Sequence, residues 1–145
     1  MATKRETAGY VLEDQVGHLL RRAHQRHAAI FQNHIGDAQV TPLQFAALVK
    51  LRDLGEVSQN LLGRLTAMDA ATMQGVIKRL AARGVIERRP DPDDRRRLIL
   101  SLSVEGRALV DALIPHGADI TARTLEPLTA AEQRAFLDLL AKISE

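Results

Sequence analysis

The sequence predicts a mainly α-helical fold that carries one small β-hairpin. Apolar residues recur at helical spacing through most of the 145 residues. Two short β-type runs, 85–89 and 98–102, are separated by a turn-rich stretch of Pro, Asp and Arg residues. Helix-capping patterns precede several of the apolar stripes, at Thr41, Asp69 and Thr129.

The composition fits a single small domain. Apolar residues make up 46% of the chain, which is enough to bury a core. No run of about 18 apolar residues could span a membrane, and the charged start Met1–Glu6 has no apolar signal core behind it. We therefore expect a cytoplasmic protein. The absence of cysteine excludes disulfides, thiolate zinc sites, cysteine nucleophiles and thiol-based redox switches.

The first predicted helix covers residues 9–35. One face carries Leu12, Val16, Leu20, Ala23, His27, Ile30 and His34. So long an apolar stripe exceeds what a small domain can cover, so we interpret this helix as part of a dimer interface. A second helix starts at a capping box formed by Thr41 and Gln44, with Pro42 in the first helical position. Its expected buried stripe is Leu43, Ala47, Leu51 and Leu54, and Gly55 ends it.

Two helices with a short connection follow, which is the pattern of a helix-turn-helix. Ser58 caps the first, and the turn Thr66–Met68 leads to the second, which Asp69 caps and Gly84 ends. The second helix has a buried stripe of Met73, Val76, Ile77 and Leu80.

The opposite side of that second helix has the chemistry of a DNA-reading surface. It is small at Gly75, polar at Thr72 and Gln74, and cationic at Lys78 and Arg79. A helix in a major groove needs close approach, hydrogen-bonding groups for base edges and charge for phosphates. An ordinary amphipathic surface helix is the alternative interpretation of this helix alone.

The hairpin that follows resembles a wing, because Arg95, Arg96 and Arg97 lie in the loop between its strands. Arginines suit the negative potential of a narrow minor groove. The net charge is only +2, but residues 50–107 hold 12 Lys and Arg against 8 Asp and Glu. The basic excess therefore lies on the segment that is expected to contact DNA.

Two more helices close the chain. The first runs from Ser103 toward Leu125, and Pro115 is expected to interrupt and kink it. The second starts at a capping box of Thr129 and Glu132. Apolar helices at both ends of the chain predict a dimerisation region, and such oligomers are normally two-fold symmetric.

The run from Arg79 to Gly106, RLAARGVIERRPDPDDRRRLILSLSVEG, resembles the wing signature of the multiple antibiotic resistance regulator (MarR) family. The family pattern of Asp, any residue, then Arg before the second strand matches Asp94–Arg96. The resemblance implies a dimeric winged helix-turn-helix transcription factor, usually a repressor, with a wing-tip Arg96 steadied by Asp94. It also implies release from double-stranded DNA by a small phenolic or carboxylate effector.

These observations predict one domain over residues 1–145, with a winged helix-turn-helix at 41–103 and dimerisation helices at 9–35 and 104–145. Two-fold symmetry predicts a pseudo-palindromic operator with half-sites about one helical turn apart. We expect nine residues at the DNA: Thr72, Gln74, Gly75, Lys78, Arg79, Asp94, Arg95, Arg96 and Arg97.

In the resembling family, effectors bind under the first and second helices, between the dimerisation helices and the winged domain. The chain offers His18, Arg21 and Arg22 on the first helix and Phe45 on the second. Arginine can bind a carboxylate through two hydrogen bonds, so these residues would suit an aromatic acid. The alternative is that both arginines are solvated and that His18 only packs.

Metal binding and catalysis are the remaining alternatives. Four of the five histidines lie on the first helix, at His18, His24, His27 and His34, so a zinc-responsive regulator is one rival. No nucleophile, phosphate loop or carboxylate pair indicates an enzyme, and we expect no cofactor. A winged helix that binds only proteins is the second rival.

Overall fold

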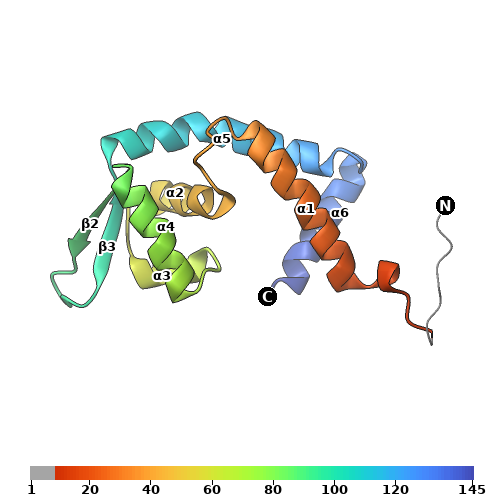
Figure 1. Cartoon of the computed structure of the whole chain (residues 1–145), viewed down its shortest axis with the longest axis horizontal. Coiled ribbons are helices and arrows are strands. Elements are labelled where there is room, and N and C mark those ends of the chain that lie inside the picture. Colours follow the sequence, from red (N-terminus) through yellow and green to blue (C-terminus); the bar gives the residue numbers. More distant parts are fainter. Residues whose placement is uncertain (1–8) are drawn as a thin grey trace. The chain divides into compact units, whose positions relative to one another are not determined.

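The computed structural model describes residues 9–145 (Figure 1). Residues 1–8, which include the charged start Met1–Glu6, lie outside the described part. The chain divides into two compact units: a winged unit of residues 35–118, and a terminal unit whose described residues are 9–34 and 119–145. The elements are η1 (Leu12–Asp14), α1 (Val16–His34), α2 (Pro42–Leu54), β1 (Glu56–Ser58), α3 (Gln59–Leu65), α4 (Ala70–Ala82), β2 (Ile86–Pro90), β3 (Leu98–Leu102), α5 (Val104–Leu125) and α6 (Ala130–Ile143).

The sheet of the winged unit has three antiparallel strands in the order β1-β3-β2. Leu100 at the centre of β3 pairs with Val57 on one side and Arg88 on the other, and its side chain is fully buried. The predicted two-stranded hairpin is therefore present and has a third strand beside it. β1 has only three residues, too few to show an alternating pattern in the sequence.

The core of the winged unit lies between the helices and this sheet. All four predicted stripe residues of α4, from Met73 to Leu80, are buried there. The predicted stripe of α2 is partly wrong, because Leu43 and Leu54 are exposed. The buried residues of α2 are Gln44, Ala47, Leu48 and Leu51. Ala47 and Leu51 belong to both sets, so at about 100° per residue the buried face is turned by only roughly 55° from the expected one.

The helix starts follow the predicted caps. Thr41 forms a capping box with Gln44, and Thr129 forms one with Glu132. The Asp69 carboxylate accepts the backbone N–H of Thr72 at 2.7 Å. That hydrogen bond holds the pKa of Asp69 below its ordinary value. Gly84 has φ +80°, so the chain leaves α4 in the left-handed conformation that was predicted there.

The described terminal unit consists of η1, α1, the end of α5 and α6. The first helix is shorter than predicted, since α1 begins at Val16 rather than at Gly9. Gly9 has φ +78°, and both Val11 and Gln15 are extended, so a regular helix cannot run through this stretch. Among the described residues, no helix has the length and apolar character needed to cross a bilayer.

α5 runs without a break from Val104 to Leu125, with Pro115 inside it. The expected interruption at Pro115 is therefore wrong. Proline removes one backbone donor from a helix. Buried residues on both sides of it, Val110 and Leu113 before and Ile120 after, pack the helix in place.

Candidate nucleic-acid interface

A short, well-held turn sets α3 against α4. The Met68 N–H donates to the Gly63 carbonyl at 2.8 Å, and the Thr66 hydroxyl donates to the Leu62 carbonyl at 2.6 Å. The Met68 side chain is buried, and a Cβ on Gly63 would lie 3.2 Å from the Met68 carbonyl oxygen. Helix-turn-helix geometry therefore follows from close backbone packing at the turn, and α4 has a fixed place in the winged unit.

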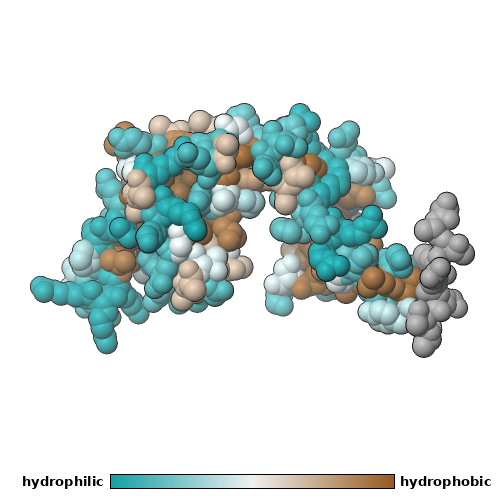
Figure 2. Space-filling model, viewed as in Figure 1, coloured by the Kyte–Doolittle hydropathy of each residue, from teal (hydrophilic) through white to brown (hydrophobic). Residues whose placement is uncertain are grey.

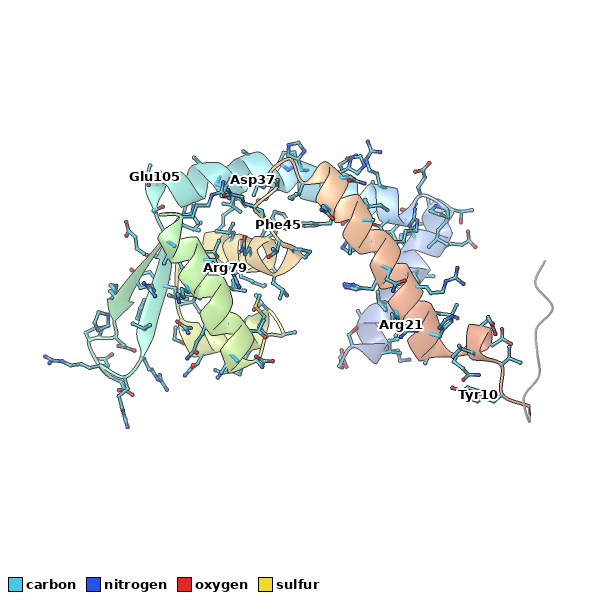
Figure 3. All side chains as sticks on the ribbon, viewed as in Figure 1. Tyr10, Arg21, Asp37, Phe45, Arg79 and Glu105 are labelled. Atoms are coloured by element: carbon cyan, nitrogen blue, oxygen red, sulfur yellow. The ribbon has the colours of Figure 1, made fainter. Side chains whose placement is uncertain are left out.

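The five residues of α4 predicted at DNA are grouped on one side of the helix. Gln74, Lys78 and Arg79 are exposed, whereas Thr72 and Gly75 are half-buried. Figure 3 shows Arg79 on α4. A Cβ on Gly75 would lie 3.3 Å from Nη1 of Arg79, so this glycine leaves space for the guanidinium stem. This side of α4 can offer amide and hydroxyl groups to base edges and two cations to phosphates.

The wing places two of its arginines, Arg96 and Arg97, beside one carboxylate. Asp94 accepts hydrogen bonds from the backbone N–H of Arg96 at 3.0 Å and from Nε of Arg96 at 3.2 Å. The Arg97 Nε lies 4.0 Å from the other oxygen of Asp94. The Arg96 side chain is nevertheless 93% exposed, so its two Nη groups point to solvent while Nε is held. The predicted steadying of Arg96 by Asp94 is present in the structure.

Ion pairs neutralise other arginines of the winged unit. Arg52 pairs with Asp111 at 2.7 Å, and Arg89 pairs with Glu56 at 2.9 Å. Within residues 9–145, by contrast, no carboxylate pairs with Lys78, Arg79, Arg88 or Arg95. α4 and the wing therefore carry cations that no carboxylate of the described residues pairs with, in the segment where the sequence predicts contact with DNA. Figure 2 shows the hydrophilic surface over the wing.

A further ion pair secures the end of α4. Arg83, the C-cap residue of this helix, forms two hydrogen bonds with Asp37, at 3.3 and 2.5 Å. Both side chains are largely shielded, with 31% and 19% exposed. The hydrogen bond from Arg83 holds the pKa of Asp37 below its ordinary value of 3.8. The loop before α2 is thus tied to the end of the helix proposed to read DNA.

Asp37→Asn is expected to destabilise the protein by about 1 kcal/mol at pH 7, since it removes a charge-assisted pair that is partly screened by water. A carboxyl whose pKa is depressed by folding stabilises the native state above its unfolded pKa, and this contribution disappears as the pH falls through the folded pKa. Urea unfolding at pH 7 and pH 3 should show the difference between variant and parent shrinking in acid. Asp53→Asn, at an exposed site on α2, is the control. An equal difference in unfolding free energy at both pH values would contradict a stabilising role for the ionised Asp37 carboxylate.

Two polar residues that sequence reasoning missed lie beside the predicted ones. Gln59 and Asn60, in the first turn of α3, line a surface groove of about 200 Å³ together with Gln74, Arg96 and Arg97. Their position depends on how α3 packs near the wing. The local signal was only that both follow the cap residue Ser58, which does not distinguish a binding residue from a solvated one.

The candidate ligand residues are divided between the two units. His18, Arg21 and Arg22 lie on α1 in the terminal unit, and both arginines are exposed. Among residues 9–145, the buried Nδ1 of His18 has no hydrogen-bond partner, which is unusual for a buried polar atom. Phe45 lies on α2 in the winged unit (Figure 3), where its ring would be 2.7 Å from a Cβ on Gly117.

The terminal unit holds a groove of about 350 Å³ between α1, α5 and α6. At this groove, Nδ1 of His27 lies 2.9 Å from the Thr124 hydroxyl, which itself donates to the Ile120 carbonyl at 2.8 Å. His27 is therefore the donor to Thr124. Burial, with a contribution from His24, lowers the pKa of His27 and favours its neutral form.

In the described residues, no group of three His, Cys, Asp or Glu side chains could hold a metal ion.

Known proteins resemble both the sequence and this arrangement. A model described as the MarR family matches residues 40–98. The HTH-type transcriptional repressor NicR of Pseudomonas putida is 47% identical over 92% of this chain and 85% of its own length. The chain belongs to the MarR family.

Solved structures of MarR-like regulators have the same fold. A probable transcriptional regulator from Pseudomonas aeruginosa matches with a TM-score of 0.88 at 52% identity, over 91% of this chain and 98% of that one. BpsR of Bordetella bronchiseptica, whose DNA binding is regulated by 6-hydroxynicotinic acid, matches with a TM-score of 0.90 at 46% identity, over 94% and 97%. The predicted winged helix-turn-helix fold and the predicted role as a DNA-binding transcriptional regulator are confirmed.

Proposed function

We propose that this MarR-family regulator is a homodimeric cytoplasmic repressor that is released from its operator by a small aromatic carboxylate. The observation that carries this proposal is the unpaired cationic side of α4 beside the arginine-tipped wing, both within the winged unit. In this proposal the protein acts only by binding, without catalysis. Each subunit places α4 in a major groove and its wing at the adjacent minor groove or phosphates.

The proposed DNA contacts are those predicted from the sequence, and they divide into base-reading residues, a wing contact and phosphate contacts. Gln74 and Thr72 offer hydrogen bonds to base edges, and Gly75 permits close approach of the backbone. Arg96 is held by Asp94 for the wing contact. Charge for phosphates comes from Lys78, Arg79, Arg95 and Arg97.

The homodimer is supported by apolar surface on the terminal unit. Every residue of α6 is exposed or half-buried, and Phe136, Leu139 and Ile143 are at least 40% exposed. On α1, Val16 and Leu20 are also exposed. Soluble monomers rarely leave so much contiguous apolar surface uncovered. A second copy of the chain would bury it, and two-fold symmetry would match a pseudo-palindromic operator.

The proposed effector class rests on two arguments. Relatives include a regulator whose DNA binding responds to 6-hydroxynicotinic acid, an aromatic ring with a carboxylate and a hydroxyl group. On α1, Arg21 and Arg22 can bind a carboxylate, and the unpartnered Nδ1 of His18 can accept or donate one hydrogen bond. Phe45 is proposed as an apolar contact for the ring. A phenolic acid would meet the same chemical requirements.

The test of this function is binding to the DNA immediately upstream of the protein's own gene. Fluorescence anisotropy across a salt series, with and without 6-hydroxynicotinic acid, separates the parts of the proposal. Tight binding that weakens steeply with salt supports the DNA-binding part of the proposal. Release by 6-hydroxynicotinic acid, but not by nicotinamide, which has no carboxylate, supports the effector part. The Arg21→Ala, Arg22→Ala, His18→Ala and Phe45→Ala proteins should then need more acid for release. Salt-steep binding without release by any aromatic acid would remove the effector proposal, and no specific binding would favour a winged helix that binds proteins.

Lys78→Ala is expected to weaken binding to operator and to unrelated DNA alike, by roughly fivefold near 0.1 M salt. Because a phosphate contact releases counterions, the slope of log Kd against log salt should fall by about one unit for each contact removed. The Lys78→Arg protein keeps the charge and should keep the slope. A changed preference between operator and unrelated DNA would instead make Lys78 a base-reading residue.

A further inference from the structure

The groove beside the wing combines three elements of the winged unit. Ser58 and the first turn of α3 contribute one wall, Gln74 of α4 contributes another, and residues 96–98 of the wing close it. A second groove, of about 190 Å³, adjoins it and shares three of its residues: Gln59, Asn60 and Gln74. These three amides therefore form a continuous polar strip between the wing and the recognition helix.

The lining of the wing-side groove favours an anion. Six of its seven described residues are polar and none is acidic, while two are arginines. Nε of Arg96 is engaged by Asp94, which leaves the Nη groups of that guanidinium as donors. Within residues 9–145, the amides of Gln59, Asn60 and Gln74 have no hydrogen-bond partner. The groove thus offers NH₂ donors and positive charge without a competing carboxylate in its wall.

We propose that Gln59 and Asn60 bind one phosphodiester of the operator backbone in this groove, next to the Arg96 and Arg97 guanidiniums. This inference rests on the proposed function, and it adds two residues outside α4 and the wing. A phosphodiester has one negative charge and two free oxygens, which suits neutral amide donors supplemented by arginine. Since Gln74 borders both grooves, the bound phosphate fixes how deeply α4 enters the major groove, and so the amides position the base-reading side chains.

The experiment measures Kd of the full-length protein for operator and for unrelated duplex by anisotropy. Asn60→Ala and Gln59→Ala should each raise both Kd values about 3- to 10-fold, as expected for loss of one typical hydrogen bond. The salt slope should stay unchanged, because a neutral amide releases no counterion. Gln39→Ala, which removes an exposed amide elsewhere in the winged unit, is the matched control and should bind as the parent does. Thermal unfolding of the variants should match that of the parent.

A scan of operators with a single methylphosphonate then locates the contact. At one position per half-site, the methylphosphonate and Asn60→Ala should change the binding free energy non-additively, since both remove the same interaction. Full additivity at every position would overturn the inference. So would an unchanged Kd for both variants, or weaker binding to operator alone, which would make the amides base readers. Inorganic phosphate, added at constant ionic strength, could also compete with DNA. If the Asn60→Ala substitution abolishes that competition, the groove is a site for free phosphate instead. If the parent protein binds no duplex, the proposed function itself fails.

Discussion

Replacing Gly106 with alanine is expected to destabilise the winged unit by about 3 kcal/mol or more. An ideal Cβ at this position would lie 1.8 Å from the Val85 carbonyl oxygen and 2.8 Å from the carbonyl carbon. Both are backbone atoms, so no side-chain rotation can relieve the clash. The first turn of α5 or the start of β2 would have to move.

The hydrogen bonds around Gly106 make such a movement costly. Ser103 is buried, and its hydroxyl donates to the Gly84 carbonyl at 2.7 Å and accepts the Gly106 N–H at 3.0 Å. The Ser103 N–H donates to the Val85 carbonyl at 3.1 Å. These bonds join the end of α4 to the start of α5 at the base of the wing. A displaced α5 would break some of them and leave buried polar atoms unpaired, which adds to the steric cost.

Urea unfolding followed by circular dichroism, at one fixed protein concentration because dimer stability depends on it, measures this effect. Arg107→Ala, one residue further along the same helix at an exposed site, should change stability by less than about 0.5 kcal/mol. A Gly106→Ala protein as stable as Arg107→Ala would mean that α5 shifts freely against β2. It would also mean that the hydrogen bonds between the end of α4 and the start of α5 do not hold α5 in place.

The features of this fold that the sequence could predict are those determined by residues near one another in the chain. The α4 helix was predictable because its cap at Asp69, its apolar stripe and its stop at Gly84 all lie within sixteen residues and agree with one another. The aspartate beside the wing arginines was likewise a local pattern. By contrast, β1 forms only through pairing with β3, where Val57 meets Leu100, and three residues carry no periodic signal.

The features that the sequence did not indicate depend on contacts between distant segments. In the sequence, Gly106 is only a residue with low helix propensity. The close approach of the Val85 carbonyl in the structure gives it a structural role. Gln59 and Asn60 acquire a candidate function because α3 packs near Arg96 and Arg97 of the wing. The error in α2 has the same origin. Periodicity identified an amphipathic helix, but tertiary packing decided which of two neighbouring faces was buried.

Arg96→Ala is expected to weaken operator binding by about 1–3 kcal/mol, which corresponds to roughly 5- to 150-fold in Kd. Two observations give Arg96 this weight. Asp94 holds both its backbone N–H and its Nε, so less side-chain entropy is lost when the guanidinium binds. The Arg96 side chain as a whole is 93% exposed, so it enters a groove of the DNA without first leaving a buried site.

The specificity of the effect distinguishes a wing that reads DNA from one that only adds charge. If Arg96 enters a minor groove, its removal should cost more on operator than on unrelated duplex, because groove width varies with sequence. Arg107→Ala removes the same charge from an exposed site on α5, and it should leave the operator preference intact. Equal weakening by both variants would reduce Arg96 to a general electrostatic contribution. An unchanged Kd for Arg96→Ala would instead separate the wing from DNA recognition altogether and leave α4 as the sole reader in each subunit.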